Sequence, residues 1–372
     1  MGTQRLKVVL GRDDSYDIRV GEGLFDRLGA HLREVTEAKK AVIVTDSNVA
    51  PHYLGQVRSA LAQEGFEPFD LTVAAGEASK GLAVAAELWD ALALLGIGRD
   101  GLLVALGGGV IGDLAGFVAS TYMRGIDFVQ LPTSLLAMVD SSVGGKTALN
   151  LDGGKNLVGT FKQPAYVTAD LKALGTLPAE EWGNGFAEIA KSAFVDGGEF
   201  LSWLDGHADA LAAQDGGAVQ QAVVRSLAFK ARIVASDEKE KGVRECLNYG
   251  HTFGHALEAV SGYRIPHGRA VAEGMRFAAR LAVEAARAPA ALADAQDALL
   301  DRLGLGPVTE PFAADDLYGL MLSDKKVRNG GLRFVLLASP GAWEAVAVDP
   351  DLVKIYLILW EQARMGKRQE EL

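Results

Sequence analysis

Apolar and polar positions divide the chain into two parts with different periodicities. Up to about residue 175, short β-rich apolar runs alternate with stretches of helical spacing. The runs that we expect to form strands are RLKVVLG, YDIRVG, AVIVTD, GLLVALGGG and DFVQLPT. Strands that alternate with helices are typical of an α/β fold, in which helices cover a mainly parallel sheet. Residues 1–177 are therefore predicted to form an α/β domain.

The second part, residues 178–372, has mainly helical periodicity. After LGTLP at positions 174–178, alanine and leucine recur at helical spacing through about residue 305. A later run, GLRFVLLASPGAWEAVAV, predicts a small β-hairpin, and the polar segment EQARMGKRQEEL at the end is expected to fray. This part is therefore predicted to be a mainly α-helical domain.

Length and composition agree with two domains. A chain of 372 residues is too long for one ordinary core, and its 49% hydrophobic content is enough for two. A membrane span needs about 18–20 apolar residues, and the best candidate, GLLVALGGGVIGDLAGFVAS, is interrupted by Asp113 and several glycines. The sequence thus predicts no membrane association.

Charge and cysteine content narrow the function further. The formal net charge of −11 disfavours binding to nucleic acid or to an anionic membrane, so clustered cations are expected to serve a smaller ligand. The single cysteine, Cys246, cannot form an internal disulfide, which agrees with a reducing cytoplasm. We therefore expect a cytoplasmic protein.

A glycine-rich segment, LLVALGGGVIGD at 102–113, is the first candidate binding motif. Gly107, Gly109 and Gly112 match G-x-G-x-x-G between a predicted strand and a predicted helix, where bare backbone can approach a pyrophosphate. A Rossmann fingerprint also expects an acid after the next strand, but DFVQLPT ends in Pro132 and Thr133. The motif therefore predicts a Rossmann-like nucleotide site of variant form, or glycines that only permit a tight turn.

The acid that does end a strand is Asp46, in AVIVTDSNV. A nucleotide would then lie across the carboxyl ends of these strands, with Asp46 and Asn48 near its ribose. Glu77 and Lys80, in GEASK, are expected nearby.

A second glycine-rich segment, MVDSSVGGKTALNLDGGKNLVG, contains Gly-Lys-Thr but is not a P-loop. The P-loop pattern needs a glycine five residues before Gly145, and Asp140 stands there. What remains is a segment with Lys146, Lys155 and Asn156, which is either suited to holding an oxyanion or is a solvated loop.

Three of the six histidines gather between residues 245 and 271: His251, His255 and His267. A single helix over 244–258 would align Arg244, Asn248, His251 and His255 in one stripe, which is expected to face a polar cleft. His251 and His255, four residues apart, could present two imidazoles to one metal. A zincin would need glutamate at position 252, and threonine stands there.

A carboxylate for such a metal is available in EEWGNGFAEIAKSAFVD. Glu188 and Lys191 lie three residues apart in an otherwise apolar stretch, where a buried charge is costly unless it has a partner. A glutamate with two histidines around an open position is typical of catalytic zinc. The alternative is an ordinary helix ion pair.

Several segments together resemble the 3-dehydroquinate synthase family, the second enzyme of the shikimate pathway. They are GGGVIGDLAGFVASTYMRGIDFVQLPTSLLAMVDSSVGGKT, GKNLVG, AEIAK, LNYGHTFGHALE, HGRAV and DKKVRNGGLRFVLL, and they occur in the family's order from about residue 40 to 340. The resemblance implies an N-terminal NAD-binding domain and a C-terminal domain that binds metal and substrate.

The resemblance also implies specific roles for residues of this chain. The ligands of Zn²⁺, or of Co²⁺ in its place, correspond to Glu188, His251 and His267, whereas the residue that matches His255 contacts substrate. The residues implied for NAD are Asp46, Asn48, Glu77, Lys80, Gly108, Gly109, Asp113, Thr133, Ser134, Asp140, Ser141 and Lys155. The residues implied for catalysis are Asp140, Lys146, Lys191, Asn248 and His255.

The implied substrate, 3-deoxy-D-arabino-heptulosonate 7-phosphate, carries a phosphate and a carboxylate, each of which needs cations. By resemblance, the residues around its two anionic ends and its ring are Arg124, Lys155, Asn156, Lys230, Arg244 and one of Lys325 and Lys326. Lys230 and Arg244 would bind the carboxylate. The implied products are 3-dehydroquinate and phosphate, with NAD restored in each turnover. A homodimer is expected, in which Arg124 could reach across the interface.

Other activities on the same scaffold stay open at this point. The segment GGKTALNLDGGKN and Tyr249 depart from the usual family pattern. The alternatives are a sugar phosphate cyclase of the aminodehydroquinate, valiolone or inosose type, a metal-dependent polyol dehydrogenase, and a binding protein without activity. Lys230 and Arg244 favour a substrate with a carboxylate, which the valiolone and inosose enzymes do not use.

Overall fold

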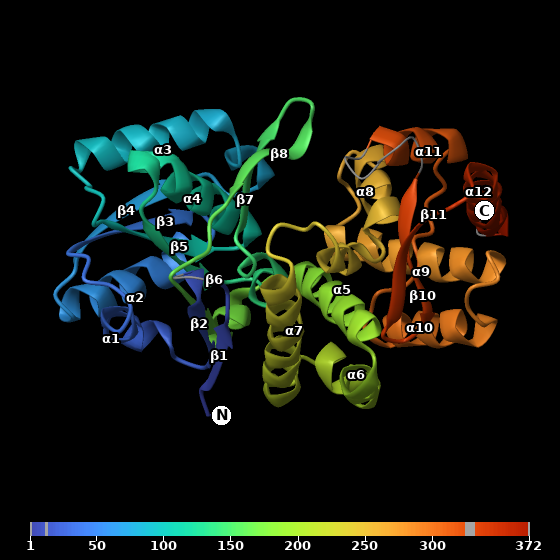
Figure 1. The fold of residues 1–372 in the computed structure, drawn as a ribbon, viewed down its shortest axis with the longest axis horizontal. Helices are drawn as coiled ribbons and strands as arrows, with labels where there is room; N and C mark the ends of the chain where they lie inside the picture. Colours follow the sequence, from blue (N-terminus) through green and yellow to red (C-terminus); the bar gives the residue numbers. More distant parts are fainter. Residues whose placement is uncertain (1, 12–13, 324–331, 371–372) are drawn as a thin grey trace. The chain divides into compact units, whose positions relative to one another are not determined.

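The computed structural model describes residues 2–11, 14–323 and 332–370, which fall into two compact units (Figure 1). The first unit comprises the chain up to Trp182 together with Val219–Lys239, and the second comprises Gly183–Ala218 and Glu240–Leu372. The first boundary lies five residues after the predicted one. The segment Val219–Lys239 packs with the N-terminal part, so the division is not the single cut that the change in periodicity suggested.

A seven-stranded sheet forms the centre of the first unit, with strand order β1-β2-β9-β6-β5-β3-β4. The strands are parallel except for β1, which pairs with β2 in antiparallel register. Their bounds are β1 Gln4–Val8, β2 Tyr16–Gly21, β3 Lys40–Asp46, β4 Glu67–Val73, β5 Leu102–Gly107, β6 Asp127–Pro132 and β9 Tyr166–Asp170. The predicted mainly parallel sheet is confirmed, as are the five predicted strands.

Helices cover both faces of this sheet (Figure 1). Their bounds are α1 Leu28–Arg33, α2 Ala50–Gln63, α3 Leu82–Leu94 and α4 Gly109–Thr121. Apolar side chains of α3 and α4 pack with those of β3 and β5 in one core cluster. All six residues of β5 are buried, which is why LLVALG reads as a continuous apolar run rather than an alternating one.

A separate hairpin of β7, Lys146–Leu151, and β8, Gly154–Phe161, lies in the sequence between the sheet strands β6 and β9. Short helical turns lie between the main elements of this unit: η2 Phe25–Arg27, η3 Glu77–Ser79, η4 Tyr122–Arg124, η5 Ala137–Ser141 and η6 Leu171–Thr176. The sequence did not predict the hairpin, because its glycines read as a loop.

The second unit is mainly helical, as predicted. Two helices, α5 Ala179–Asp196 and α7 Gly216–Ser236, each span a unit boundary. The other helices of the unit are α6 Gly198–Ala212, α8 His251–Val260, α9 His267–Glu284, α10 Ala290–Arg302, α11 Ala314–Ser323 and α12 Pro350–Glu370, with the turn η7 Val243–Asn248. The predicted hairpin is present as β10 Arg333–Ser339 and β11 Ala342–Ala347, and β10 packs against α9. The polar end that we expected to fray is helical through Glu370.

Helices α8 and α9 approach each other closely through glycine. A Cβ atom on Gly274 of α9 would lie 1.8 Å from the carbonyl oxygen of Gly250, which precedes α8. No side chain fits in that space, so the position requires glycine. This approach brings the segment before His251 against α9.

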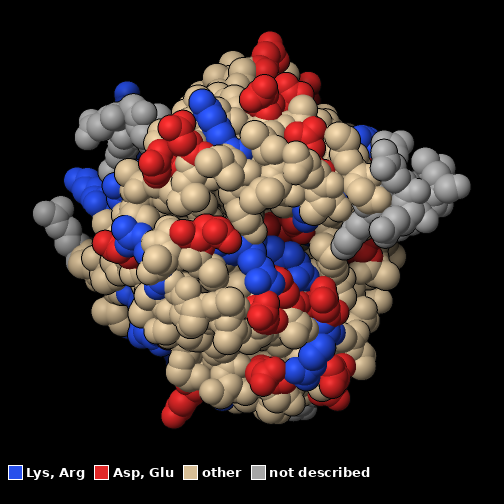
Figure 2. All heavy atoms as spheres, turned by 90° about the vertical axis from the view of Figure 1, so that its right-hand side faces the viewer, with Lys and Arg blue, Asp and Glu red and all other residues tan. Residues whose placement is uncertain are grey.

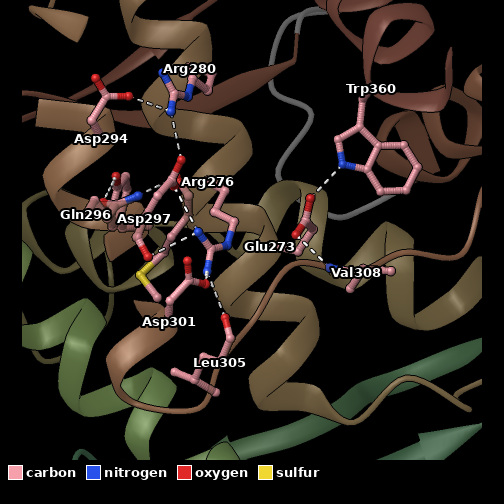
Figure 3. Close-up of polar contacts among 12 residues, drawn as sticks. Glu273, Arg276, Arg280, Asp294, Gln296, Asp297, Asp301, Leu305, Val308 and Trp360 are labelled. Carbon is pink, nitrogen blue, oxygen red and sulfur yellow. Dashed lines mark hydrogen bonds and ion pairs between the residues drawn. The ribbon is translucent and has the colours of Figure 1, made fainter. Parts of the chain in front are cut away.

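Helices α9, α10 and α12 enclose a network of charged side chains (Figure 3). Glu273, which is 2% exposed, accepts hydrogen bonds from Trp360 Nε1 at 2.7 Å and from the Val308 amide at 3.0 Å, and it pairs with Arg364. Arg276 donates to a carboxylate oxygen of Asp301 at 2.8 Å. The network thus joins α12 to α9 by buried charge as well as by apolar packing.

A hollow of about 360 Å³ lies beside this network and is lined by its charged residues and by aromatic side chains. Figure 2, which views the molecule from the side of α12, shows basic side chains gathered beside acidic ones around a hollow. Among the described residues, no helix is both long and apolar enough to cross a membrane.

The buried pair of Glu273 and Arg364 gives a prediction about stability. Glu273→Gln leaves the Arg364 guanidinium without its buried carboxylate, so we expect the free energy of unfolding in urea to fall by about 3 kcal/mol. The control is Glu344→Gln, because Glu344 is 69% exposed where it pairs with Arg287 and its loss should cost less than about 1 kcal/mol. Equal effects of the two substitutions would contradict a structural role for the buried pair.

Candidate metal centre and cofactor edge

The residues predicted to bind a nucleotide lie at the carboxyl edge of the first unit's sheet. Asp46 ends β3, and its Oδ1 accepts hydrogen bonds from the amides of Asn48 at 2.8 Å and Val49 at 3.0 Å. The carboxylate is therefore held in place by the turn that leads into α2.

The glycine-rich turn lies at the same edge, between β5 and α4. Gly108 is the residue that caps α4, and a Cβ atom there would lie 3.5 Å from Ser134 Oγ, whereas one on Gly109 would lie 3.1 Å from Ser141 Oγ. Side chains would therefore fill the space above the helix N-terminus, where amides and the helix dipole favour an anion. These residues fit the pyrophosphate of a dinucleotide.

Lys80 links three segments of the first unit. It is 5% exposed, and its Nζ lies 2.5 Å from an oxygen of Asp113 and 2.6 Å from Asn156 Oδ1. Burial raises the pKa of Asp113, and the charge of Lys80 opposes this shift. Lys80 thus joins α4 to the β7–β8 hairpin.

Asn150, to which the sequence assigned no role, joins the same hairpin to Glu77. Its Nδ2 donates to Glu77 Oε1 at 2.7 Å, and its Oδ1 accepts from the Asn156 amide at 2.9 Å. No sequence pattern marks such a tertiary contact. The residues predicted for NAD and those predicted for an oxyanion are therefore connected through Asn150 and Lys80.

Asp140 lies in η5, a π-helical turn, a local geometry that is frequent at functional sites. Lys230 Nζ donates to the Asp140 carbonyl oxygen at 2.6 Å and to Oδ1 at 2.7 Å. Thr133 continues β6, with its amide on the Gly107 carbonyl oxygen. The structure thus brings Asp140 and Lys230 together, a contact that the sequence did not predict.

The remaining predicted cations of the first unit lie on its surface or on the hairpin. Lys146 begins β7 and is exposed, and Lys155 lies on β8 and is half-buried. Arg124 is exposed in η4 and has a left-handed backbone, with φ of 69°. Lys325 and Lys326 lie outside the described residues.

Three side chains of the second unit converge on one point. Glu188 comes from α5, His251 is the first residue of α8, and His267 is the first residue of α9. Each offers a ligand atom within 4.8 Å of the other two, and both Nε2 atoms lie 3.4 Å from Glu188 Oε1. One carboxylate and two imidazoles are the donor set of a catalytic zinc site.

The helix that we expected over 244–258 is wrong. Residues Val243–Asn248 form the turn η7, and α8 begins only at His251. Gly250 interrupts the run because its φ is +79° and because it lies against Gly274. His251 and His255 keep their four-residue spacing on α8, but Arg244 and Asn248 do not belong to the same helix.

Polar partners surround the cluster. Lys191, one turn after Glu188 on α5, is 2% exposed and forms an ion pair with Glu188. His255 packs its ring against that of His251, with centroids 5.2 Å apart. Asn248 donates through Nδ2 to Glu240 at 3.1 Å. Arg244 is 1% exposed in η7.

Burial and neighbouring charges shift the pKa values of the cluster in different directions. Burial would raise the pKa of Glu188, but Lys191 and the two imidazoles lower it well below its usual range. Burial, together with the charge of Lys191, lowers the pKa of His251 to about 4. Burial acts in the same direction on His267, but its contacts with the carboxylates of Glu188 and Glu258 raise its pKa to about 10.

The chemistry of this donor set fits a divalent metal. Within the described chain, neither oxygen of Glu188 has a hydrogen-bond partner of ordinary geometry, although Lys191 and both imidazoles lie against it. Each imidazole also has an acceptor at its other nitrogen: the Tyr249 carbonyl oxygen lies 3.1 Å from His251 Nδ1, and Glu258 Oε2 lies 3.3 Å from His267 Nδ1. Both rings are therefore held with Nε2 toward Glu188.

Family models match the chain in two adjacent segments. Residues 70–184 match the model of the 3-dehydroquinate synthase N-terminal region, and residues 185–327 match that of the C-terminal region. The 3-dehydroquinate synthase of Symbiobacterium thermophilum is 45% identical over 344 residues, which cover 91% of this chain and 95% of that protein. That of Caulobacter vibrioides is 45% identical over 365 residues, which cover 92% and 95%.

Solved structures show the same fold. A 2-deoxy-scyllo-inosose synthase complexed with carbaglucose-6-phosphate, NAD⁺ and Co²⁺ has a TM-score of 0.89 at 24% identity and covers 95% of this chain and 99% of its own. The 2-epi-5-epi-valiolone synthase of Streptomyces hygroscopicus subsp. jinggangensis, with NAD⁺ and Zn²⁺ bound, has a TM-score of 0.85 at 27% identity and covers 96% and 100%.

The raised pKa of His267 gives a prediction about metal binding. At pH 8 the metal-free His267 holds a proton, because its pKa is about 10, whereas a metal needs the neutral ring. Binding of a divalent ion at pH 8 should therefore release about one proton. Calorimetric titration in two buffers of different ionisation enthalpy measures this number. Metal binding without proton release would show that His267 is already neutral.

Proposed function

The chain belongs to the 3-dehydroquinate synthase family, and on that premise we propose that it converts 3-deoxy-D-arabino-heptulosonate 7-phosphate into 3-dehydroquinate and phosphate. The observation that carries the proposal is the cluster of Glu188, His251 and His267 beside Lys191, in a chain with a dinucleotide-type sheet edge. The cluster supplies a catalytic metal site and the sheet edge supplies a site for NAD. Both are needed for a reaction that oxidises and then reduces its substrate within one turnover.

Glu188, His251 and His267 would hold the metal, with Zn²⁺ as the proposed ion and Co²⁺ as the alternative. When bound, the ion would supply Lewis acidity at a substrate hydroxyl, and NAD would supply a hydride acceptor that is regenerated. Lys191 and Asn248 would orient hydroxyl groups of the substrate. Because Lys191 is almost fully buried, its ammonium is held in one place and excludes water from the carboxylate that it contacts.

The NAD site would use the carboxyl edge of the sheet. Asp46 and Asn48 would bind the ribose, and the turn at Gly108 and Gly109 would bind the pyrophosphate. The other residues proposed for NAD are Glu77, Lys80, Asp113, Thr133, Ser134, Asp140, Ser141 and Lys155. The buried contact of Lys80 with Asp113 supports this site, since it fixes a carboxylate on the first turns of α4.

Cationic and polar side chains would bind the anionic groups of the substrate. For the phosphate these are Lys146, Asn156 and Arg124 in the first unit, His255 in the second, and Lys325 or Lys326. For the carboxylate they are Lys230 and Arg244. Asp140 and Lys155 would lie at the ring hydroxyls. Complementary charge of this kind selects for a dianionic ligand although the protein is acidic. A homodimer, in which Arg124 completes the partner's phosphate site, is part of the proposal.

Product analysis tests the proposed reaction. The full chain, incubated with the heptulosonate phosphate, trace NAD and Zn²⁺, is expected to release phosphate while absorbance at 340 nm stays flat, because the hydride returns to the product. Accumulating NADH would instead identify a metal-dependent polyol dehydrogenase. Release of phosphate only from a sugar phosphate without a carboxylate would identify a cyclase of the valiolone or inosose type, and neither signal would indicate a binding protein.

Arg244 tests the choice of an acidic substrate. Arg244 is 1% exposed, so a substrate carboxylate at its guanidinium would bind largely out of water, where a charge pair is strong. Arg244→Gln should raise the KM for the heptulosonate phosphate by about 10–100-fold, since hydrogen bonds to charged groups contribute about 1.5–3 kcal/mol. Steady-state kinetics measure the change.

The control for this substitution is Arg302→Gln, which also removes one arginine from the second unit. Arg302 pairs with Asp205 and Asp209 on the surface, and its loss should leave KM unchanged. An unchanged KM in Arg244→Gln as well would show that Arg244 does not bind the carboxylate.

A further inference from the structure

Glu258 is a buried acid that the proposed reaction does not use. It lies in the last turn of α8, two turns after His251, and is 8% exposed. The helix dipole disfavours a carboxylate at this end of a helix, and burial disfavours it further. A glutamate in this position therefore needs a compensating partner.

The side chain of His267 is that partner. Glu258 Oε2 lies 3.3 Å from His267 Nδ1, and His267 begins α9, where the helix dipole favours negative charge. The carboxylate therefore lies where a hydrogen-bond donor and a favourable helix end come together. It contacts one ring nitrogen, and Glu188 contacts the other.

The two ring nitrogens of His267 contact different carboxylates. When a carboxylate accepts the Nδ1 proton, the lone pair of a neutral ring is on Nε2, and this nitrogen can bind a metal. Nε2 of His267 lies 3.4 Å from Glu188 Oε1, on the side of the proposed ion. The same arrangement holds for His251, where the Tyr249 carbonyl oxygen takes the place of Glu258.

We propose that Glu258 is a positioning residue of the metal centre, which fixes the ring of His267 and directs its Nε2 lone pair to the ion. This inference rests on the proposed metal site at Glu188, His251 and His267. A carboxylate behind a ligating histidine also makes the imidazole a stronger donor, and its loss typically weakens metal binding by about 10–100-fold.

The backbone of Glu258 makes hydrogen bonds of its own, so a substitution can test the side chain separately. Its carbonyl oxygen accepts hydrogen bonds from Ser261 Oγ at 2.9 Å and from the Tyr263 amide at 2.8 Å. These bonds end α8 and shape the turn toward α9. A substitution that changes only the carboxylate keeps them.

The test is the zinc affinity of the full-length protein, measured by competition with a chromophoric chelator. Glu258→Gln keeps the size of the side chain and removes its charge, and it is expected to weaken zinc binding by about 10–100-fold and to speed zinc loss to excess chelator. Glu258→Asp keeps the charge but withdraws it from Nδ1. Its zinc affinity is therefore expected to lie between that of the unsubstituted protein and that of Glu258→Gln. This second variant also serves if Glu258→Gln does not fold.

Glu273→Gln is the matched control, because it removes a buried carboxylate from α9 that faces Trp360 and Arg364 instead of a metal ligand. It should lower stability and leave the zinc affinity of the folded protein unchanged. If Glu258 served only to join α8 to α9, Glu258→Gln would behave like Glu273→Gln, and the inference would be overturned.

The experiment also separates this inference from the function on which it depends. If the unsubstituted protein binds zinc and Glu188→Gln abolishes that binding, the metal site stands and only the role of Glu258 is in question. If the unsubstituted protein binds zinc no more tightly than Glu188→Gln does, the metal site itself is overturned.

Discussion

A single buried carboxylate, that of Glu188, sets the arrangement of the second unit. A charge that is 1% exposed is stable only if its neighbours compensate for it. Three helices meet this requirement: α5 supplies Lys191 one turn away, and α8 and α9 each begin with a histidine whose Nε2 faces the carboxylate. The glycine contact between Gly250 and Gly274 makes this convergence sterically possible. The same contacts therefore determine both how these helices pack and which side chains meet at the site.

The first unit also brings polar side chains together, but it does so at the edge of a parallel sheet. Parallel strands end at one edge of a sheet, so side chains that follow β3 and β5 gather there without any contact between neighbours in sequence. Lys80 and Asn150 then tie this edge to the β7–β8 hairpin. The hairpin carries Lys146 and Asn156, which are proposed for the phosphate, and it is held by residues that are proposed for NAD. If both proposals hold, cofactor binding and substrate binding would be linked through short polar contacts within this unit.

Hydrophobic patterning predicted the elements that are apolar throughout or along one helical face, and it failed elsewhere. The central strand LLVALG and the helical second half were evident, whereas β4, EPFDLTV, was missed because its residues are only partly buried and its alternation is weak. The helix expected over 244–258 was wrong because a glycine with positive φ leaves no trace in apolar spacing. Glu188 was found because an acid in an apolar stretch is itself a signal. Glu258 was missed because its partner, nine residues later, is set by the turn between two helices.

Buried cations of this acidic chain are held in place by carboxylates, and this bears on the proposed binding of anions. Lys80, Lys191 and Lys230 are each less than 9% exposed, and each lies against a carboxylate that is itself a proposed site residue. Such pairs hold the ammonium groups in place without a ligand, so less conformational entropy is lost on binding. An anionic substrate or a metal would compete with a carboxylate or an ammonium that is already in place. Under the proposed function, binding would be the difference between two sets of ion pairs, and that difference, rather than the number of cations, would discriminate a dianionic sugar phosphate from a singly charged one.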